Sequence, residues 1–176
     1  MRLFAGLRPS GEFRAALSVL QDRLRSAGVA GRYLDPSNLH MTLAFIGEWP
    51  EDVTAVLPAV EQPFSVTLAS PGVFPEAKVL WAGVEASEAL EHLARRVRDN
   101  LTGNGIPFDP KKFNPHITLA RKPSVPAGVV LSGFEVPAAS MVVDEVCLFR
   151  SDRGPDGMVY TVIGSTREGD GPEGEN

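Results

Sequence analysis

The sequence predicts an α+β fold made of two similar halves, in which two antiparallel sheets line a central cleft and the helices pack on the outside. Three observations predict this bilobal arrangement. A four-residue motif, His-x-Thr-Leu, occurs twice. Each copy follows a strand-like segment and then a helix-like segment, and the two sets of segments stand in nearly the same register. We therefore expect residues 1–164 to form one duplicated domain.

The first element of each half is a short apolar strand followed by an amphipathic helix. Residues 3–7 resemble residues 80–84 at a displacement of 77 positions. Apolar side chains then recur at helical spacing in both halves. They are Phe13, Leu17, Leu20 and Leu24 in the first half and, displaced by 77, Leu90, Ala94, Val97 and Leu101 in the second.

The ends of both predicted helices carry matching capping residues. Ser10 and Ser87 stand just before the two apolar stripes, again 77 positions apart, and serine is a favoured N-cap residue. Gly28 and Gly105 stand just after the stripes, where glycine commonly ends a helix. Caps, stripes and glycines in one register indicate an internal duplication.

The two motifs are predicted to lie on half-buried strands. They read His40-Met41-Thr42-Leu43 and His116-Ile117-Thr118-Leu119, and the histidines are 76 positions apart. Alternate residues of a strand share a face, so each motif presents an imidazole and a hydroxyl together and turns its apolar residues to a core. Further strands are expected at residues 64–69, 79–84, 141–149 and 158–163, with a turn-rich loop at 153–157 and mostly loop at 124–137.

Composition restricts the class of protein. Hydrophobic residues make up 43% of the chain, which suffices for a core, and no apolar run is long enough to span a bilayer. A strand-like segment begins within the first four residues, so no signal peptide is expected. The lone Cys147 is expected to be a buried thiol. We expect a cytoplasmic monomer with no membrane partner.

The charge is unevenly distributed along the chain. Residues 165–176 contain one arginine and four acidic residues, which is −3 of the total net charge of −5. This glycine-rich acidic segment is expected to be a disordered tail. The remaining −2 argues against extended electrostatic tracking of nucleic acid and is compatible with recognition of a strand end through local contacts.

Paired histidines suit acid–base chemistry at one substrate. Histidine exchanges protons near neutral pH, and two of them flanking a phosphodiester can serve as general base and general acid. Attack and departure at phosphorus lie roughly in line, so the two groups belong on opposite sides of the phosphate. The two motifs are chemically equivalent, so the sequence leaves the assignment of the two roles open.

The paired motifs, the duplication and the size resemble the two-histidine (2H) phosphoesterase superfamily, in particular its LigT-like RNA 2′,3′-cyclic phosphodiesterases. The resemblance covers residues 1–164 and includes segments 2–4, 39–43, 74–75, 79–81 and 115–121. It implies a bilobal fold with a cleft and no metal or other cofactor. It also implies hydrolysis of the 2′,3′-cyclic phosphate of RNA ends or nucleosides to a 2′-phosphomonoester.

The resemblance also implies roles for five residues. His116 is the proton acceptor that activates water, and His40 is the proton donor to the leaving 3′ oxygen. Thr42 and Thr118 donate hydrogen bonds to the non-bridging phosphate oxygens. Arg121 matches an arginine that follows the second motif and binds the phosphate through its guanidinium.

Arg121 presents a geometric difficulty. On a regular strand it points away from the face that carries the histidine, so it reaches the phosphate only where the strand twists, bulges or ends. No arginine follows the first motif, where Ile46-Gly47 stands instead. Three aromatic residues, Phe4, Tyr33 and Trp81, could stack on a terminal base or belong to the core. The third histidine, His92, lies off the helix stripe and is expected to be exposed.

Several alternatives remain open from the sequence. A metal-dependent phosphatase needs clustered ligands, and only Asp35, Glu48 and Asp109 stand near the motifs. The same cleft could act on 2′–5′ linked RNA or on another cyclic phosphate, such as one derived from ADP-ribose. A protein of another class, a non-catalytic module that binds RNA ends, would retain binding without turnover.

Overall fold

The computed structural model of the protein describes residues 1–167, which form two α-helices, three short 3₁₀ helices and nine strands. The α-helices are α1 (Gly11–Ser26) and α2 (Glu88–Gly103), and the 3₁₀ helices are Pro36–Asn38, Thr54–Val56 and Leu131–Gly133. The strands are β1 (Arg2–Leu7), β2 (Ala30–Tyr33), β3 (Met41–Glu48), β4 (Phe64–Phe74), β5 (Val79–Val84), β6 (Ile117–Ser124), β7 (Ser140–Val143), β8 (Cys147–Gly154) and β9 (Gly157–Ser165).

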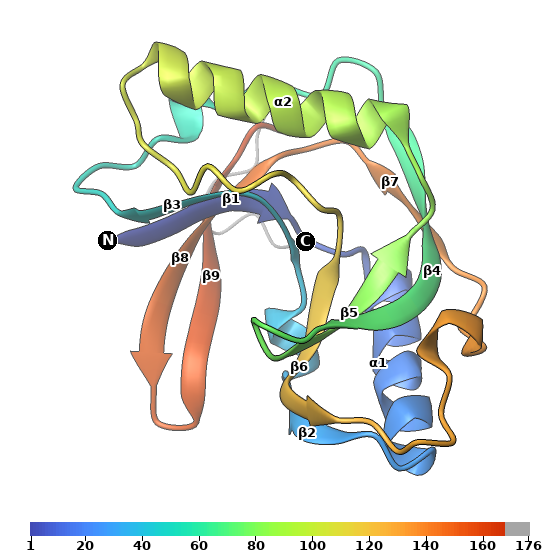
Figure 1. Ribbon diagram of the computed structural model, residues 1–176. Coiled ribbons are helices and arrows are strands. Elements are labelled where there is room, and N and C mark those ends of the chain that lie inside the picture. Colours follow the sequence, from blue (N-terminus) through green and yellow to red (C-terminus); the bar gives the residue numbers. More distant parts are fainter. Residues whose placement is uncertain (168–176) are drawn as a thin grey trace.

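The strands form two sheets, and every neighbouring pair in them is antiparallel. One sheet has the order β3-β1-β8-β9, and the other has the order β2-β6-β5-β4-β7. The two motif strands, β3 and β6, therefore lie in different sheets, each beside the strand that opens its own half (Figure 1). This arrangement confirms the predicted α+β class with two antiparallel sheets.

Both helices begin and end where the sequence predicts. The Ser10 side chain accepts a hydrogen bond from the Phe13 amide at 3.2 Å, and Ser87 accepts one from the Leu90 amide at 3.1 Å. Each serine thus satisfies one amide that the first helical turn leaves unpaired. Two residues after the last residue of each helix stand Gly28 and Gly105, whose φ angles of 93° and 71° favour glycine.

Each helix packs on the sheet that holds the other half's motif strand. In Figure 1, α2 lies across β1 and β3, and α1 lies behind the sheet that contains β5 and β6. Two side-chain hydrogen bonds follow the same crossing: Gln21 of α1 donates to the Leu119 carbonyl of β6, and Arg98 of α2 donates to the Leu43 carbonyl of β3. The crossing ties the two halves together.

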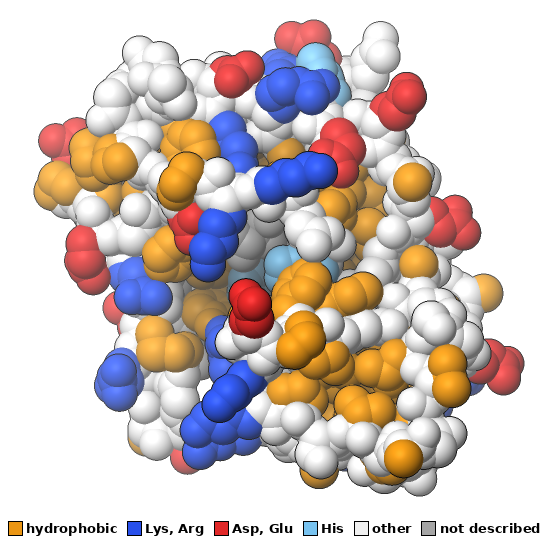
Figure 2. Space-filling model, viewed as in Figure 1, with side chains coloured by type: hydrophobic (Ala, Val, Ile, Leu, Met, Phe, Trp, Pro, Cys, Tyr) orange, Lys and Arg blue, Asp and Glu red, His pale blue; other side chains and the backbone are white. Residues whose placement is uncertain are grey.

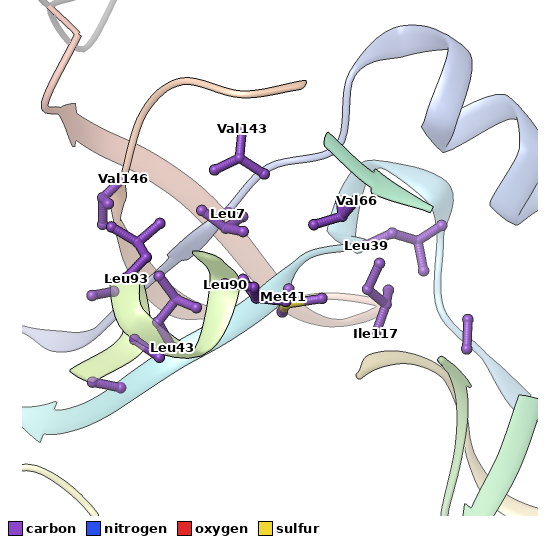
Figure 3. Packing of buried hydrophobic residues seen from close by; sticks show 14 of the residues in the cluster. Leu7, Leu39, Met41, Leu43, Val66, Leu90, Leu93, Ile117, Val143 and Val146 are labelled. Carbon is purple, nitrogen blue, oxygen red and sulfur yellow. The ribbon is translucent and has the colours of Figure 1, made fainter. Parts of the chain in front are cut away.

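The apolar residues of the motifs belong to one continuous core. Met41 and Ile117, which follow the two histidines, are 1% and 2% exposed. Figure 3 shows Leu90 and Leu93 of α2 on the same side as Leu43 of β3. The predicted division of each motif into a polar face and a core face is confirmed for these apolar positions.

Two strand predictions need correction. The strand expected at residues 64–69 continues to Phe74 as β4, across Pro71, where the pairing with β5 shifts register. The single strand expected at 141–149 is two strands, because β7 pairs with β4 in one sheet and β8 pairs with β1 in the other. The chain changes sheets between them, so the apolar run cannot be one strand.

The C-terminal hairpin is longer and tighter than the sequence suggests. β8 and β9 pair as far as Gly154 and Gly157, which leaves only two residues in the turn. β9 reaches Ser165, one residue past the expected domain boundary, and Arg167 pairs with Asp144 and Glu145 at 2.7 and 2.8 Å. The rest of the expected acidic tail, residues 168–176, lies outside the described residues.

No helix in residues 1–167 is long and apolar enough to cross a membrane.

Candidate active site

A β-bulge interrupts the first motif strand directly after its threonine. Gly6 of β1 pairs with Thr42, but the preceding residue, Ala5, pairs with Ala44, so Leu43 is passed over in the ladder. Leu43 and Ala44 are both fully buried. Two consecutive residues on the core side break the alternation of faces at this point.

The second motif strand carries the same bulge at the same place. Trp81 of β5 pairs with Thr118, and Leu80 pairs with Ala120, so Leu119 is passed over. Leu119 and Ala120 are again fully buried. The duplication therefore extends to an irregularity of the backbone.

The bulges return the next residue of each strand to the cleft. Arg121 lines the same cavity as Thr118, and Phe45 lines it together with Thr42. The geometric difficulty with Arg121 is therefore resolved by a bulge. The counterpart of Arg121, 76 positions earlier, is Phe45, which corrects the assignment of that position to Ile46-Gly47.

The cavity between the two sheets has a volume of about 710 Å³ and is open to solvent. Figure 2 shows histidine surface within the central hollow of this face. His40, Thr42, Thr118 and Arg121 all line the cavity. His116 is not among the lining residues, but it lies near enough to His40 for a positive charge on its ring to lower the pKa of His40.

The cavity extends mainly over the sheet that holds β3. Beyond the motif residues, its walls in that sheet include Arg2, Phe45, Arg153, Met158 and Tyr160. Among the residues that the structure describes, the strands of the second sheet contribute only Thr118 and Arg121 to the lining. The site therefore has more room and more aromatic and basic surface on the His40 side.

The backbone orients the His40 imidazole. Its Nδ1 lies 2.8 Å from the Asn38 carbonyl oxygen, which can only accept, so Nδ1 carries the hydrogen. Its Nε2 lies 3.1 Å from the Thr42 hydroxyl. In the neutral tautomer Nε2 therefore accepts a hydrogen bond from Thr42.

His116 is oriented in the same way. Its Nδ1 lies 2.6 Å from the Asn114 carbonyl oxygen, so its Nε2 is again the nitrogen that is free to exchange a proton. Its ring meets Phe74 edge-on, with centroids 4.9 Å apart. Both halves thus select the same tautomer with a carbonyl two residues before the histidine.

Aromatic rings surround His40. Its ring centroid lies 4.6 Å from Phe4, 4.9 Å from Tyr160 and 5.5 Å from Phe149. Burial among these rings is the main reason that the pKa of His40 falls to about 4, because the imidazolium loses its hydration there. The charges of His116 and Arg121 also lower this pKa, and the hydrogen bond to the Asn38 carbonyl partly opposes the shift. In the free protein His40 is therefore neutral at pH 7.

The other aromatic candidates divide between cavity and scaffold. Phe4 lines the cavity. The Tyr33 hydroxyl donates to the Val29 carbonyl at 2.7 Å, and Trp81 packs against Phe74. His92 is exposed on α2, as expected.

Sequence reasoning missed several residues around the site. Tyr160 and Arg153 line the cavity, and Phe149 contacts the His40 ring. All three lie on the β8–β9 hairpin, whose sequence carries no motif, and only strand pairing brings them to the site. Phe45 could have been found, because it occupies the position of Arg121 in the repeat.

The acidic residues near the motifs have structural partners. Asp35 accepts from the Ser37 amide at 2.9 Å, and Asp109 accepts from the Lys111 amide at 3.0 Å. Glu48 lies 3.5 Å from the N-terminal ammonium group. Within residues 1–167 no three His, Cys, Asp or Glu side chains are grouped closely enough to hold a metal ion.

Two His-x-Thr strands from opposite sheets, meeting at one cavity in a duplicated α+β fold, define this protein as a two-histidine phosphoesterase. Residues 10–155 match the profile of the 2′-5′ RNA ligase superfamily, and the chain belongs to that family.

The chain is similar over most of its length to proteins from bacteria and archaea. It is 37% identical to a protein of Thermus thermophilus named RNA 2′,3′-cyclic phosphodiesterase, over 93% of this chain and 88% of the other. It is 30% identical to a protein of the same name from Methanothermobacter thermautotrophicus, over 92% and 95% of the two chains.

Solved structures also resemble this fold over most of the chain. The crystal structure of TT0787 of Thermus thermophilus superposes with a TM-score of 0.73 at 34% identity, over 94% of this chain and 96% of that chain. Apo LigT of E. coli superposes with a TM-score of 0.76 at 28% identity, over 93% and 95%. LigT has also been crystallised with 3′-AMP.

Proposed function

We propose that this protein is a metal-independent RNA 2′,3′-cyclic phosphodiesterase that leaves a 2′-phosphomonoester. One observation carries the proposal: two imidazoles at the starts of strands in opposite sheets are held in the same tautomer and lie within electrostatic reach of each other, and His40 lines one cavity together with Thr118 and Arg121 of the other sheet. The names of the relatives, at up to 37% identity over most of the chain, support the same activity.

The shape of the cavity supports an assignment of the two histidine roles. The room for a nucleoside lies over the His40 sheet, so the ribose and its leaving 3′ oxygen lie on that side of phosphorus. Nε2 of His116 takes a proton from water as the new P–O bond forms. The bond from phosphorus to the 3′ oxygen breaks, and that oxygen takes a proton from Nε2 of His40.

His40 must acquire a proton before it can act as an acid. Its pKa is about 4 in the free protein, so the group is neutral there at pH 7. A bound phosphodiester brings a negative charge next to the ring, which favours imidazolium and raises this pKa. Substrate binding therefore shifts His40 toward the protonated form that the acid role requires.

Three further side chains bind the phosphate in this scheme. Arg121 balances the charge that grows on the non-bridging oxygens in the transition state. Thr42 and Thr118 donate hydroxyl hydrogen bonds to the same oxygens. Thr42, which bonds His40 in the free protein, turns to the phosphate when the imidazole becomes charged and no longer accepts.

The charges of the cavity favour an RNA end over a single nucleotide. Two carboxylates line the cavity, and both have partners: Asp152 is paired with Arg150 at 2.7 Å, and Glu48 with the N-terminal ammonium group. Within residues 1–167 no carboxylate pairs with the cavity guanidinium groups of Arg2, Arg121 and Arg153. Three such groups suit a substrate with more than one phosphate.

The test is turnover of a short RNA that ends in a 2′,3′-cyclic phosphate, with and without EDTA, followed by identification of the product. We expect a 2′-phosphate in both conditions, and slower turnover of nucleoside 2′,3′-cyclic phosphates. Faster turnover of 2′–5′ linked RNA or of an ADP-ribose cyclic phosphate would show that this compound, and not the 2′,3′-cyclic end of RNA, is the preferred substrate. Binding without turnover, or loss of activity in EDTA, would overturn the proposal.

A further inference from the structure

Two polar side chains connect the helices to the bulges of the motif strands. Gln21 on α1 donates to the carbonyl of Leu119, the residue that the β6 bulge passes over in the ladder. Arg98 on α2 donates to the carbonyl of Leu43, the corresponding residue of β3. Gln21 and Arg98 are 77 positions apart, the displacement that relates the two helices.

Gln21 is a buried polar residue on an otherwise apolar helix face. It is 1% exposed, and its Nε2 lies 3.1 Å from the Leu119 carbonyl oxygen and 3.0 Å from the Leu34 carbonyl oxygen. A buried amide is costly unless its hydrogen bonds are made, and both hydrogens of this amide are used. The two carbonyls belong to the bulge and to the segment that follows β2.

Arg98 makes the equivalent connection with a longer side chain. Its Nε lies 3.1 Å from the Leu43 carbonyl oxygen, and its Nη1 lies 2.7 Å from the Lys111 carbonyl oxygen. The guanidinium lies over the rings of Phe108 and Phe113, at 5.4 and 6.0 Å. This group joins the first bulge to the segment that leads into the second motif.

We propose that Gln21 and Arg98 are positioning residues of the active site, each of which holds the bulge that turns Arg121 or Phe45 into the cavity. This inference rests on the proposed function. Without its bulge a strand resumes regular alternation, and the third residue after the threonine leaves the cleft face. Gln21 therefore acts on substrate through Arg121, and Arg98 acts through Phe45.

The test is a double-mutant cycle between Gln21 and Arg121 on hydrolysis of an RNA 2′,3′-cyclic end. Gln21→Leu removes both donors at similar volume. We expect it to raise KM by about tenfold with a much smaller change in kcat, because it weakens phosphate binding by Arg121 and leaves the two histidines in place. In the Arg121→Ala background the same substitution should raise KM no further.

The matched control is Leu17→Ala, which damages the packing of the same helix and removes no hydrogen bond to the bulge. It should lower the melting temperature and leave KM unchanged. Equal increases of KM by Gln21→Leu in both backgrounds, an unchanged KM, or an equal increase caused by Leu17→Ala would each overturn the inference. If Gln21→Leu does not fold, two other cycles serve in its place. One pairs Gln21→Met with Arg121→Ala, and the other pairs the partly exposed Arg98→Met with Phe45→Ala.

These outcomes are separate from those that test the proposed function. Turnover by the wild-type protein tests the proposed function. The coupling between Gln21 and Arg121, or between Arg98 and Phe45, tests the positioning role.

Discussion

The two halves of this protein share a backbone plan and differ in the surroundings of their histidines. Each half has a capped helix, a carbonyl that fixes the imidazole tautomer, and a bulge after the threonine. His40, however, is enclosed by Phe4, Phe149 and Tyr160, whereas among the described residues His116 has a single aromatic contact, with Phe74.

The residue that each bulge turns into the cavity also differs. It is Phe45 in the first half and Arg121 in the second. In the proposed reaction the shared features supply two groups that exchange protons, and the differences decide which group acts as acid and which as base. In the proposed function the aromatic surface around His40 contacts the nucleoside and Arg121 binds the phosphate, while Arg2 and Arg153 add positive charge on the His40 side.

The largest effect is expected from removal of either imidazole. His40→Ala and His116→Ala should each lower kcat by about a thousandfold, because each removes one proton transfer from the transition state. An aryl phosphodiester, whose phenolate leaves without a proton, distinguishes the two roles. His40→Ala should turn over this substrate at nearly the wild-type rate, whereas His116→Ala should not. The opposite pattern would exchange the roles of the two histidines.

A smaller effect is expected at the paired positions that follow the bulges. Arg121→Ala should raise KM by about tenfold for every cyclic phosphate tested, because it removes a charged contact to the phosphate. Phe45→Ala should raise KM for RNA ends more than for the smallest cyclic phosphates. Arg32→Ala, an exposed change opposite Arg121 on β2, is the matched control. Equal effects of Arg121→Ala and Arg32→Ala would argue against phosphate binding by Arg121.

The aromatic enclosure should be visible in a histidine titration. NMR should give a pKa of about 4 for His40 in the free protein, and a higher value when a nucleoside 2′-monophosphate is bound. Phe149→Leu opens the enclosure and should move the free value toward the ordinary 6.5. An ordinary pKa for His40 in the wild-type protein would show that the surrounding rings do not desolvate the imidazole.

The same pKa determines the sign of a stability effect. The folded pKa of His40 lies below its unfolded value, so the unfolded chain binds the proton first as the pH falls. Stability should therefore decrease as the pH falls from about 6.5 to about 4. His40→Gln should reduce this pH dependence in urea unfolding. An unchanged slope would show that another group is responsible.

The smallest effects are expected at the helix caps, where the halves are most alike. Ser10→Ala and Ser87→Ala should each lower the free energy of unfolding by about 1 kcal/mol, because each removes one capping hydrogen bond. Thermal or urea unfolding measures both. A difference of several kcal/mol between the two variants would show that the caps are not equivalent.

Local patterns predicted much of the fold and of the candidate site. Apolar spacing and capping residues located both helices, and the repeated motif located both histidine strands. Local patterns failed where neighbours in space control the backbone. The run from 141 to 149 divides because its two parts pair in different sheets. Regular alternation alone would turn Arg121 away from the cleft, and only the strand pairing shows the bulge that returns it to the cavity.

The order of residues alone was enough to indicate a duplicated α+β protein with paired His-x-Thr strands, since capping, helical periodicity and strand alternation act over a few neighbouring residues. The aromatic enclosure of His40, the place of Arg121 in the cavity and the crossing of the helices depended on the three-dimensional fold. They arise from contacts between segments that are far apart in the chain, such as Phe4 with Phe149 and Gln21 with Leu119, and no local pattern records such contacts.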